Sequence, residues 1–489
     1  MTTEWSLDEL YKGFDDPAYG KDVAELTAQI DALATLLADA GGMQEKERTE
    51  KVLAAQSGIA QLFYQLSLYV ELRQSVNTED GTVMAENAKL MKLQAKIAPL
   101  EAAAGKLLAG IRDVDALAKE SGLVREHTFY LKEKQKEAKH LLSDEVEEMA
   151  ASMNMSGGAA WSKLQSYLTS TVKGDYQGKQ ITLSEVRNLA YSPEASVRKS
   201  AYEAEIAAYE KVEDAIAFSL NYIKNQVTML SEKRGYASPL AMTLEQSRMK
   251  RETLDAMMAA IDEYLPVFRK YLRKKGGMLG HVNGLPWYDL FAPLGKADKT
   301  YSIEEAKQYL IDTFTKLTPE MADLMREAFE NEWIDFYPRK GKEGGAFCAG
   351  AMWLKQSRIL TNYDGYFGSV DTLAHELGHA FHNRQIENHA PLNQDYPMPV
   401  AETASTFNEV HLGKAARAEA SGEELLNLLE NDIKEQTQCI VDIYSRYLFE
   451  TAVFEQSQNK FLMADDLKQI MLDAQKKTYG DGLDPECMH

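Results

Sequence analysis

Two histidines lie four residues apart in the segment His375-Glu376-Leu377-Gly378-His379. On a helix, residues at this spacing lie one turn apart on the same face, so both imidazoles can reach one metal ion. Glu376 is rotated away from that face, and it therefore suits proton transfer with a water on the metal better than ligation. This spacing is typical of zinc-dependent hydrolases and predicts one zinc ion held by His375 and His379.

The residues around this motif predict a helix. Ser369 or Asp371 can cap its start, and apolar residues recur on both sides of the histidines. Four of the nine histidines of the chain fall within residues 375–389. This clustering argues against a chance origin of the two histidines four residues apart. The other two in this range, His382 and His389, are expected to be ordinary helix-surface residues rather than ligands.

A catalytic zinc ion needs a third protein ligand and an open position for water. The extended motif that supplies a third histidine requires a glycine and then a histidine at fixed later positions, and this chain lacks both. A glutamate on a following helix is the alternative, and residues 399–409 predict such a helix. Glu402 and Glu409 lie two turns apart along one face, so one can ligate while the other accepts a hydrogen bond from a ligand histidine. Glu387 is a weaker rival because it lies on the histidine helix itself.

Composition limits the partners and the compartment. A formal net charge of −21 over 489 residues argues against nucleic acid and anionic membranes as partners, since phosphate binding needs a basic face. Three widely spaced cysteines predict neither a disulfide framework nor a cysteine-based metal site, which fits a reducing compartment. The N-terminal residues lack a signal-peptide pattern, and there is no run of about eighteen apolar residues. We expect a cytoplasmic protein that does not span a membrane, and we leave its oligomeric state open.

Most of the chain is predicted to be helical. Residues 23–110 carry long runs of Ala, Leu, Gln, Lys and Glu with few helix breakers. Ser6 with Glu9, and Ser302 with Glu305, have the spacing of capping boxes and predict two helix starts.

Two segments depart from this helical pattern. Residues 172–183 predict turns around short strands, near an expected boundary between an N-terminal helical lobe (residues 1–190) and the rest of the chain (residues 191–489). Residues 336–367 predict a glycine-rich loop and small strands directly before the histidine helix. A sheet edge at this place could bind an extended peptide through main-chain hydrogen bonds, although an ordinary hairpin is the simpler alternative.

Six segments carry a more specific pattern than the histidine motif alone. They are Trp-Tyr-Asp-Leu at 287–290, Gly-Gly-Ala-Phe-Cys at 344–348, and the segments at 372–380, 401–405, 441–450 and 479–485. Together they resemble the thimet oligopeptidase family of zinc metallopeptidases, and most closely its oligoendopeptidase F branch. The likeness extends along the whole chain.

This resemblance implies a fold and an activity. The fold is mainly α-helical, a multi-lobed ellipsoid with a deep substrate channel and a small β-sheet next to the histidine helix. Residues 191–489 are the implied zinc metallopeptidase catalytic domain. The implied activity is hydrolysis of internal bonds in short peptides, because a narrow channel excludes folded proteins.

The resemblance also implies roles for individual residues. His375, His379 and Glu402 are the implied ligands of one Zn²⁺ ion per chain. Glu376 is the implied general base, and Glu409 the implied hydrogen-bond partner of a ligand histidine.

Two further implications concern the substrate. Gly345 and Ala346 are implied to form part of the strand edge that binds the peptide. Family members continue into a segment with a histidine and tyrosines that contact the substrate and stabilise the oxyanion, whereas this chain stops at His489. We therefore expect a catalytic domain truncated at its C-terminus. The alternative function is then a zinc-binding, peptide-binding protein with impaired catalysis.

Overall fold

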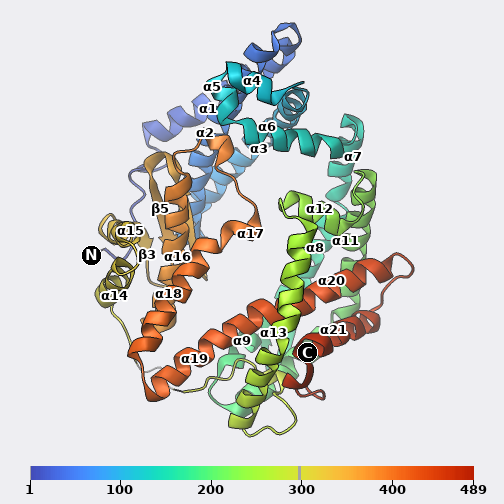
Figure 1. Cartoon of the computed structure of the whole chain (residues 1–489), viewed down its shortest axis with the longest axis vertical. Helices are drawn as coiled ribbons and strands as arrows, with labels where there is room; N and C mark the ends of the chain where they lie inside the picture. The colour runs from blue at the N-terminus through green and yellow to red at the C-terminus, as the bar shows by residue number, and fades with distance from the viewer. Residues whose placement is uncertain (1, 296–298, 489) are drawn as a thin grey trace. The chain divides into compact units, whose positions relative to one another are not determined.

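The computed structural model describes residues 2–295 and 299–488. Helices dominate these residues, together with one two-stranded and one three-stranded sheet, so the expected mainly α-helical class is confirmed (Figure 1). The chain divides into two compact units, each built from two separate stretches of sequence. The boundary expected at residue 190 stays a prediction. So does the truncation expected at His489, which lies outside the described residues.

Unit 1 comprises Met1–His140 and Ala297–Glu419. Its helices and strands are α1 (Pro17–Asp39), α2 (Glu45–Val76), α3 (Gly81–Ala109), α4 (Val114–Glu120), α5 (Gly122–Glu126), α6 (Thr128–Glu137), α14 (Ile303–Thr315), α15 (Pro319–Glu330), β3 (Ile334–Asp335), β4 (Phe347–Ala351), β5 (Gln356–Leu360), α16 (Phe367–Ile386), α17 (Met398–Ala401) and α18 (Thr403–Glu419).

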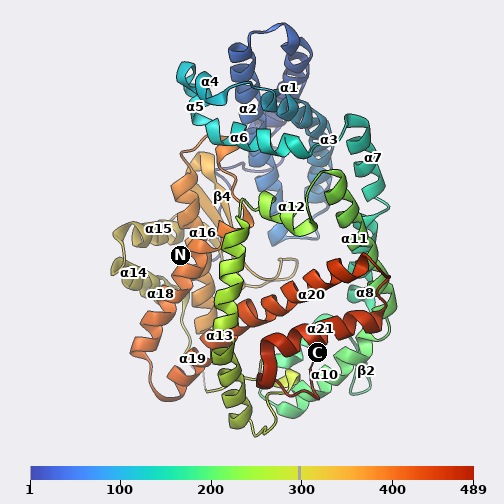
Figure 2. The same cartoon turned by 45° about the vertical axis from the view of Figure 1, so that its right-hand side comes forward.

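Unit 2 comprises Leu141–Lys296 and Ala420–His489. Its helices and strands are α7 (Asp144–Asn154), α8 (Gly158–Thr171), β1 (Lys173–Tyr176), β2 (Lys179–Thr182), α9 (Leu183–Asn188), α10 (Ala195–Tyr209), α11 (Glu213–Lys233), α12 (Pro239–Gln246), α13 (Arg251–Met278), α19 (Gly422–Gln436), a π-helical turn (Thr437–Asp442), α20 (Ile443–Ser457) and α21 (Ala464–Tyr479). The antiparallel pair α20 and α21 lies side by side, as Figure 2 shows.

Short 3₁₀ helices join several of these elements. They span Ala40–Gly42, Ala138–His140, Leu189–Tyr191, Trp287–Asp289, Met352–Leu354, Pro391–Asn393 and Gly480–Gly482.

The three-stranded sheet of unit 1 has the order β3-β5-β4. The central strand β5 pairs parallel with β3 and antiparallel with β4, so β4 lies at an edge of the sheet. The strands predicted within residues 336–367 are therefore present. Gly345 and Ala346, expected to belong to a strand, lie instead in the loop just before β4. Gly345 has a φ of +82°, a conformation that favours glycine and does not continue a strand.

The predicted strands within residues 172–183 are also present, because β1 and β2 pair antiparallel as a hairpin. Of the two predicted capping boxes, the one at Ser302 and Glu305 caps α14 with both reciprocal hydrogen bonds. The prediction at Ser6 and Glu9 is wrong, since no helix starts there and α1 begins only at Pro17. The backbone N–H of Ser6 donates instead to a carbonyl from the second stretch of unit 1, and this tertiary contact prevails over the local capping preference.

The helix α16 buries one face in the largest core cluster of unit 1. Five of its apolar residues are at most 2% exposed: Val370, Leu373, Ala374, Leu377 and Ala380. They pack with apolar side chains from α14, α15 and the sheet. Since these residues recur at helical spacing, their burial fixes the rotation of α16 about its axis and thereby the direction of its other side chains.

In the described ranges, 2–295 and 299–488, no helix is both long enough and apolar enough to cross a membrane. The three cysteines, Cys348, Cys439 and Cys487, are free thiols, as their spacing predicts.

Candidate metal centre

Both motif histidines lie on α16, as predicted, but its start differs from the expectation. The helix begins at Phe367, so Ser369 and Asp371 lie within its first turns and neither is its N-cap. The Ser369 hydroxyl donates to Oδ1 of Asp364 at 2.6 Å and accepts from the Asp364 N–H. This reciprocal pair ties the first turn of α16 to the chain that leads into it.

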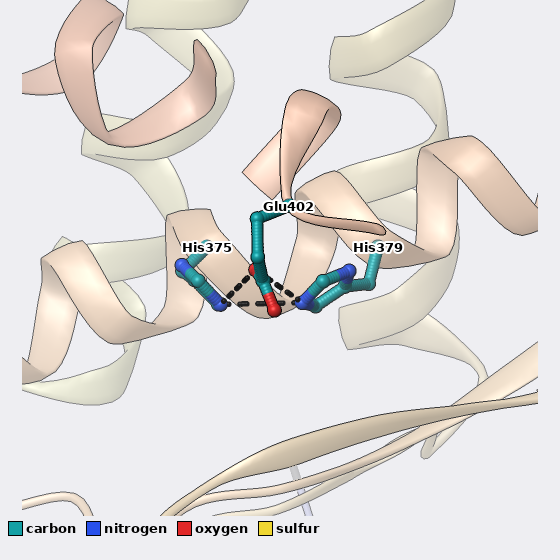
Figure 3. Close-up of side chains that lie close together, drawn as sticks. All are labelled: His375, His379 and Glu402. Atoms are coloured by element: carbon teal, nitrogen blue, oxygen red, sulfur yellow. Dashed lines mark hydrogen bonds and ion pairs between the residues drawn. The ribbon is translucent and has the colours of Figure 1, made fainter. Parts of the chain in front are cut away.

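Glu402 lies at a break between two helices. Residues 399–409 were expected to form one helix, but α17 ends at Ala401 and α18 begins at Thr403. Glu402 between them has φ −91° and ψ 9°, outside the regular helical region. Figure 3 shows the result, in which the Glu402 carboxylate lies between the two imidazole rings.

Three ligand atoms converge at this place. Nε2 of His375 and Nε2 of His379 are 3.2 Å apart. Oε2 of Glu402 lies 3.3 Å from the first and 3.2 Å from the second. Ligand atoms about 2.0–2.1 Å from one tetrahedral zinc ion are about 3.3–3.4 Å from one another. The two imidazoles and the carboxylate therefore match both the donor types and the spacing of a zinc site.

Glu409 binds the opposite side of the His375 ring. Its Oε1 lies 2.8 Å from Nδ1 of His375. Because a carboxylate accepts hydrogen bonds, Nδ1 carries the proton, and the lone pair of Nε2 faces the other two ligand atoms. This hydrogen bond is also the main reason why the pKa of His375 is raised, whereas burial lowers the pKa of His379.

The geometry separates the three glutamates that spacing alone left as alternatives. The Glu402 carboxylate lies next to the Nε2 atoms of both histidines. The Glu409 carboxylate accepts a hydrogen bond from Nδ1, on the opposite side of the His375 ring. Glu387 points elsewhere, to ion pairs with Lys355 at 4.0 Å and Arg384 at 3.4 Å. His389 is exposed after the end of α16, and the His382 ring contacts the Tyr396 ring in a tilted arrangement with ring centroids 4.4 Å apart.

Glu376 is a buried carboxyl group beside the two histidines. The residue is 4% exposed, and its Oε2 is buried without a hydrogen-bond partner. The pKa of Glu376 is raised to about 7, mainly by burial; His375 opposes this shift, and the carboxylates of Glu402 and Glu409 add to it. Burial and then the Glu376 carboxylate raise the pKa of the Cys348 thiol, so β4 borders this part of the site. A buried acceptor with a pKa near neutrality is suited to moving protons.

Burial of Glu376 also predicts a pH dependence of stability for the metal-free chain. Its pKa is raised from 4.5 to about 7 on folding, so the folded state binds the proton more tightly than the unfolded state. The free energy of unfolding therefore falls as pH rises between these two values and stays lowered above them. Glutamine does not ionise, so Glu376→Gln avoids this decrease in the free energy of unfolding. We expect the variant to be more stable than the unchanged metal-free chain by about 3 kcal/mol above neutral pH.

Urea unfolding with a chelator, at a pH below 4.5 and at one above 7, measures this difference. The two proteins should be equally stable at the lower pH. An equal free energy of unfolding at the higher pH would contradict the assigned pKa shift.

The backbones of α16 and α18 touch where the motif glycine lies. A Cβ on Gly378 would be 2.6 Å from the Ala404 oxygen and 2.6 Å from the Ser405 Cα. One turn away, the buried Asn408 Nδ2 donates to the Ala374 oxygen at 2.9 Å. These contacts fix the position of α16, which carries the two histidines, relative to α18, which follows Glu402. The sequence pattern did not predict them, although a glycine in one helix and an Ala-Ser pair in the next are a signal of close approach.

Residues 188–487 match the profile of the family described as Peptidase family M3. The chain belongs to peptidase family M3. Residues 111–173 match a second profile, described as Oligopeptidase F. Both matches confirm the resemblance inferred from the motifs, and the chain is an oligoendopeptidase F-like M3 metallopeptidase.

Curated M3 relatives share moderate identity with the chain. Oligopeptidase PepF of Bacillus subtilis is 27% identical over 497 residues, which cover 98% of this chain and 72% of the relative. An oligoendopeptidase F homolog of Mycoplasma genitalium is 30% identical over 246 residues, or 48% of this chain and 40% of the relative.

Solved structures share the fold. One from Chlamydophila abortus has a TM-score of 0.80 and 20% identity, and the match covers 98% of this chain and 82% of the other. Oligoendopeptidase F from Enterococcus faecium has a TM-score of 0.67 and 17% identity, with 96% of this chain and 81% of the other covered. At sequence identities of 20% and 17%, these matches show a shared fold and nothing more.

Proposed function

We propose that this chain is a zinc-dependent endopeptidase that hydrolyses internal peptide bonds of short oligopeptides. The observation that carries the proposal is the triangle of ligand atoms, 3.2 to 3.3 Å on a side, with a buried, unpartnered carboxyl oxygen beside it. The names of the M3 relatives, oligopeptidase and oligoendopeptidase, support the substrate class.

In this proposal His375, His379 and Glu402 hold one zinc ion. When bound, zinc supplies Lewis-acid chemistry, since it activates water near neutral pH and polarises a peptide carbonyl. Glu376 is the general base: its free Oε2 accepts the proton of the attacking water and then donates it to the leaving amine. Glu409 keeps the proton of His375 on Nδ1, so that Nε2 remains available for ligation.

The edge strand β4 is the proposed binding place for the peptide backbone. The Tyr64 hydroxyl donates to the Gly350 oxygen at 3.0 Å, which satisfies one carbonyl of this strand. In a strand, the N–H and C=O groups of every second residue point to the same side. The backbone groups of Cys348 and, just before the strand, Ala346 are therefore the ones we propose for pairing with a peptide. Gly345 precedes them in the loop, and its oxygen is already bonded to Asn362 at 2.9 Å.

Cleavage of short, internally quenched peptides by the purified chain tests the function. We expect cleavage at internal bonds, located by mass spectrometry, loss of activity on addition of a chelator, and recovery with zinc. A folded, zinc-loaded chain that binds these peptides without cleaving them would overturn the endopeptidase proposal in favour of a peptide-binding protein.

A further inference from the structure

Ser405 makes a direct contact with the proposed ligand Glu402. It lies in the first turn of α18 and is fully buried, at 0% exposure. Its Oγ lies 2.6 Å from Oε2 of Glu402 and 3.1 Å from the Glu402 backbone oxygen. A hydroxyl has one proton to donate, and the shorter contact, to a charged oxygen, is the stronger hydrogen bond. The oxygen that receives it is the one that faces Nε2 of both histidines.

Glu402 needs such a partner because little else restrains its side chain. The side chain is 56% exposed and belongs to a residue between two helices. A glutamate side chain samples several rotamers, and only some of them direct a carboxylate oxygen toward the histidines. A fixed donor on the carboxylate reduces this freedom before any metal binds.

The Ser405 hydroxyl is itself held in place by the helix contact described above. Its Cα lies against Gly378, and the Asn408–Ala374 hydrogen bond closes the same interface. The donor is therefore fixed relative to the helix that carries His375 and His379. The three ligand atoms share one rigid frame, in which Ser405 links the carboxylate to the histidine helix.

We propose that Ser405 is a positioning residue for the metal centre. Its hydroxyl holds the Glu402 carboxylate with Oε2 toward the two histidines and so raises the affinity of the site for a divalent cation. This inference rests on the proposed function, since it takes Glu402 as a ligand. Hydrogen-bond partners of metal ligands typically contribute about 10–100-fold to metal affinity.

The test is the zinc affinity of the Ser405→Ala chain, measured near neutral pH by competition with a chromophoric chelator. We expect a loss of about 10–100-fold relative to the unchanged chain. Thr406→Ala is the matched control, since it removes an exposed hydroxyl from the next position and should leave the affinity unchanged. The melting temperatures of both variants in excess chelator show whether the metal-free fold is intact.

A double-mutant cycle separates positioning from a general structural effect. If Ser405 acts through Glu402, Ser405→Ala has no further effect on zinc affinity once Glu402→Ala is present. An equal loss in both backgrounds, or an undiminished affinity of the Ser405→Ala chain, would overturn the inference alone. Failure of the unchanged chain to bind zinc would overturn the proposed metal centre and this inference with it.

Discussion

Glu376→Gln is expected to lower kcat by about 10²–10⁴-fold while the chain keeps its zinc. Glutamine has nearly the same size as glutamate but cannot accept and return a proton. The carboxyl group of Glu376 is not among the three converging ligand atoms, so its replacement should leave them in place. Turnover of a quenched peptide, measured together with the zinc content by atomic spectroscopy, gives both quantities on one sample.

Glu419→Gln makes the same chemical change at an exposed position at the end of α18, and it should leave kcat unchanged. If the Glu376→Gln chain with its full complement of zinc turned over peptides at the unchanged rate, Glu376 would not be the general base.

Glu402→Ala is expected to weaken zinc binding by more than about 100-fold, because loss of only a hydrogen-bond partner of a ligand costs about 10–100-fold. The variant removes one of three ligand atoms and leaves two imidazoles, which do not complete a tetrahedral site. Activity at limiting zinc should fall in parallel. Isothermal titration of the metal-free chain with zinc measures the effect directly.

Glu387→Ala provides the comparison. Glu387 was the rival third ligand by sequence spacing, and the structure pairs it with Arg384 and Lys355 instead. Its loss should leave zinc affinity as it is. A large loss of affinity in Glu387→Ala, with none in Glu402→Ala, would reverse the assignment of the third ligand.

The histidine pair could be predicted because it depends on local geometry alone. A helix brings residues four apart to one face, and the buried apolar residues of α16 keep that face in a fixed direction. The third ligand could not be decided in the same way. Glu402 and Glu409 were expected on one continuous helix, and the break at Glu402, which separates their directions, depends on how α18 packs against α16.

Tertiary contacts and local backbone conformation explain the other differences from the sequence-based expectations. The capping-box pattern at Ser6 and Glu9 forms no helix because that stretch is bonded to residues more than three hundred positions later. Gly345 and Ala346 lie before the strand because Gly345 takes a left-handed conformation. The Ser405 hydrogen bond was not predicted because Ser405 was expected inside one continuous helix over residues 399–409, and not just after a break at Glu402.

The division of the chain into two discontinuous units has a consequence for biosynthesis. The helices α1 to α6 leave the ribosome well before α14 to α18, with which they form unit 1. One core cluster of that unit contains side chains from α1, α2 and α3 together with Ala351 and Leu360 of the sheet. Domains generally fold as units, so unit 1 becomes complete only after residue 419 has been made. Any fragment that begins or ends within residues 142–295 therefore lacks part of both units, and the unit that carries the three ligands is complete only once the chain has been made as far as residue 419.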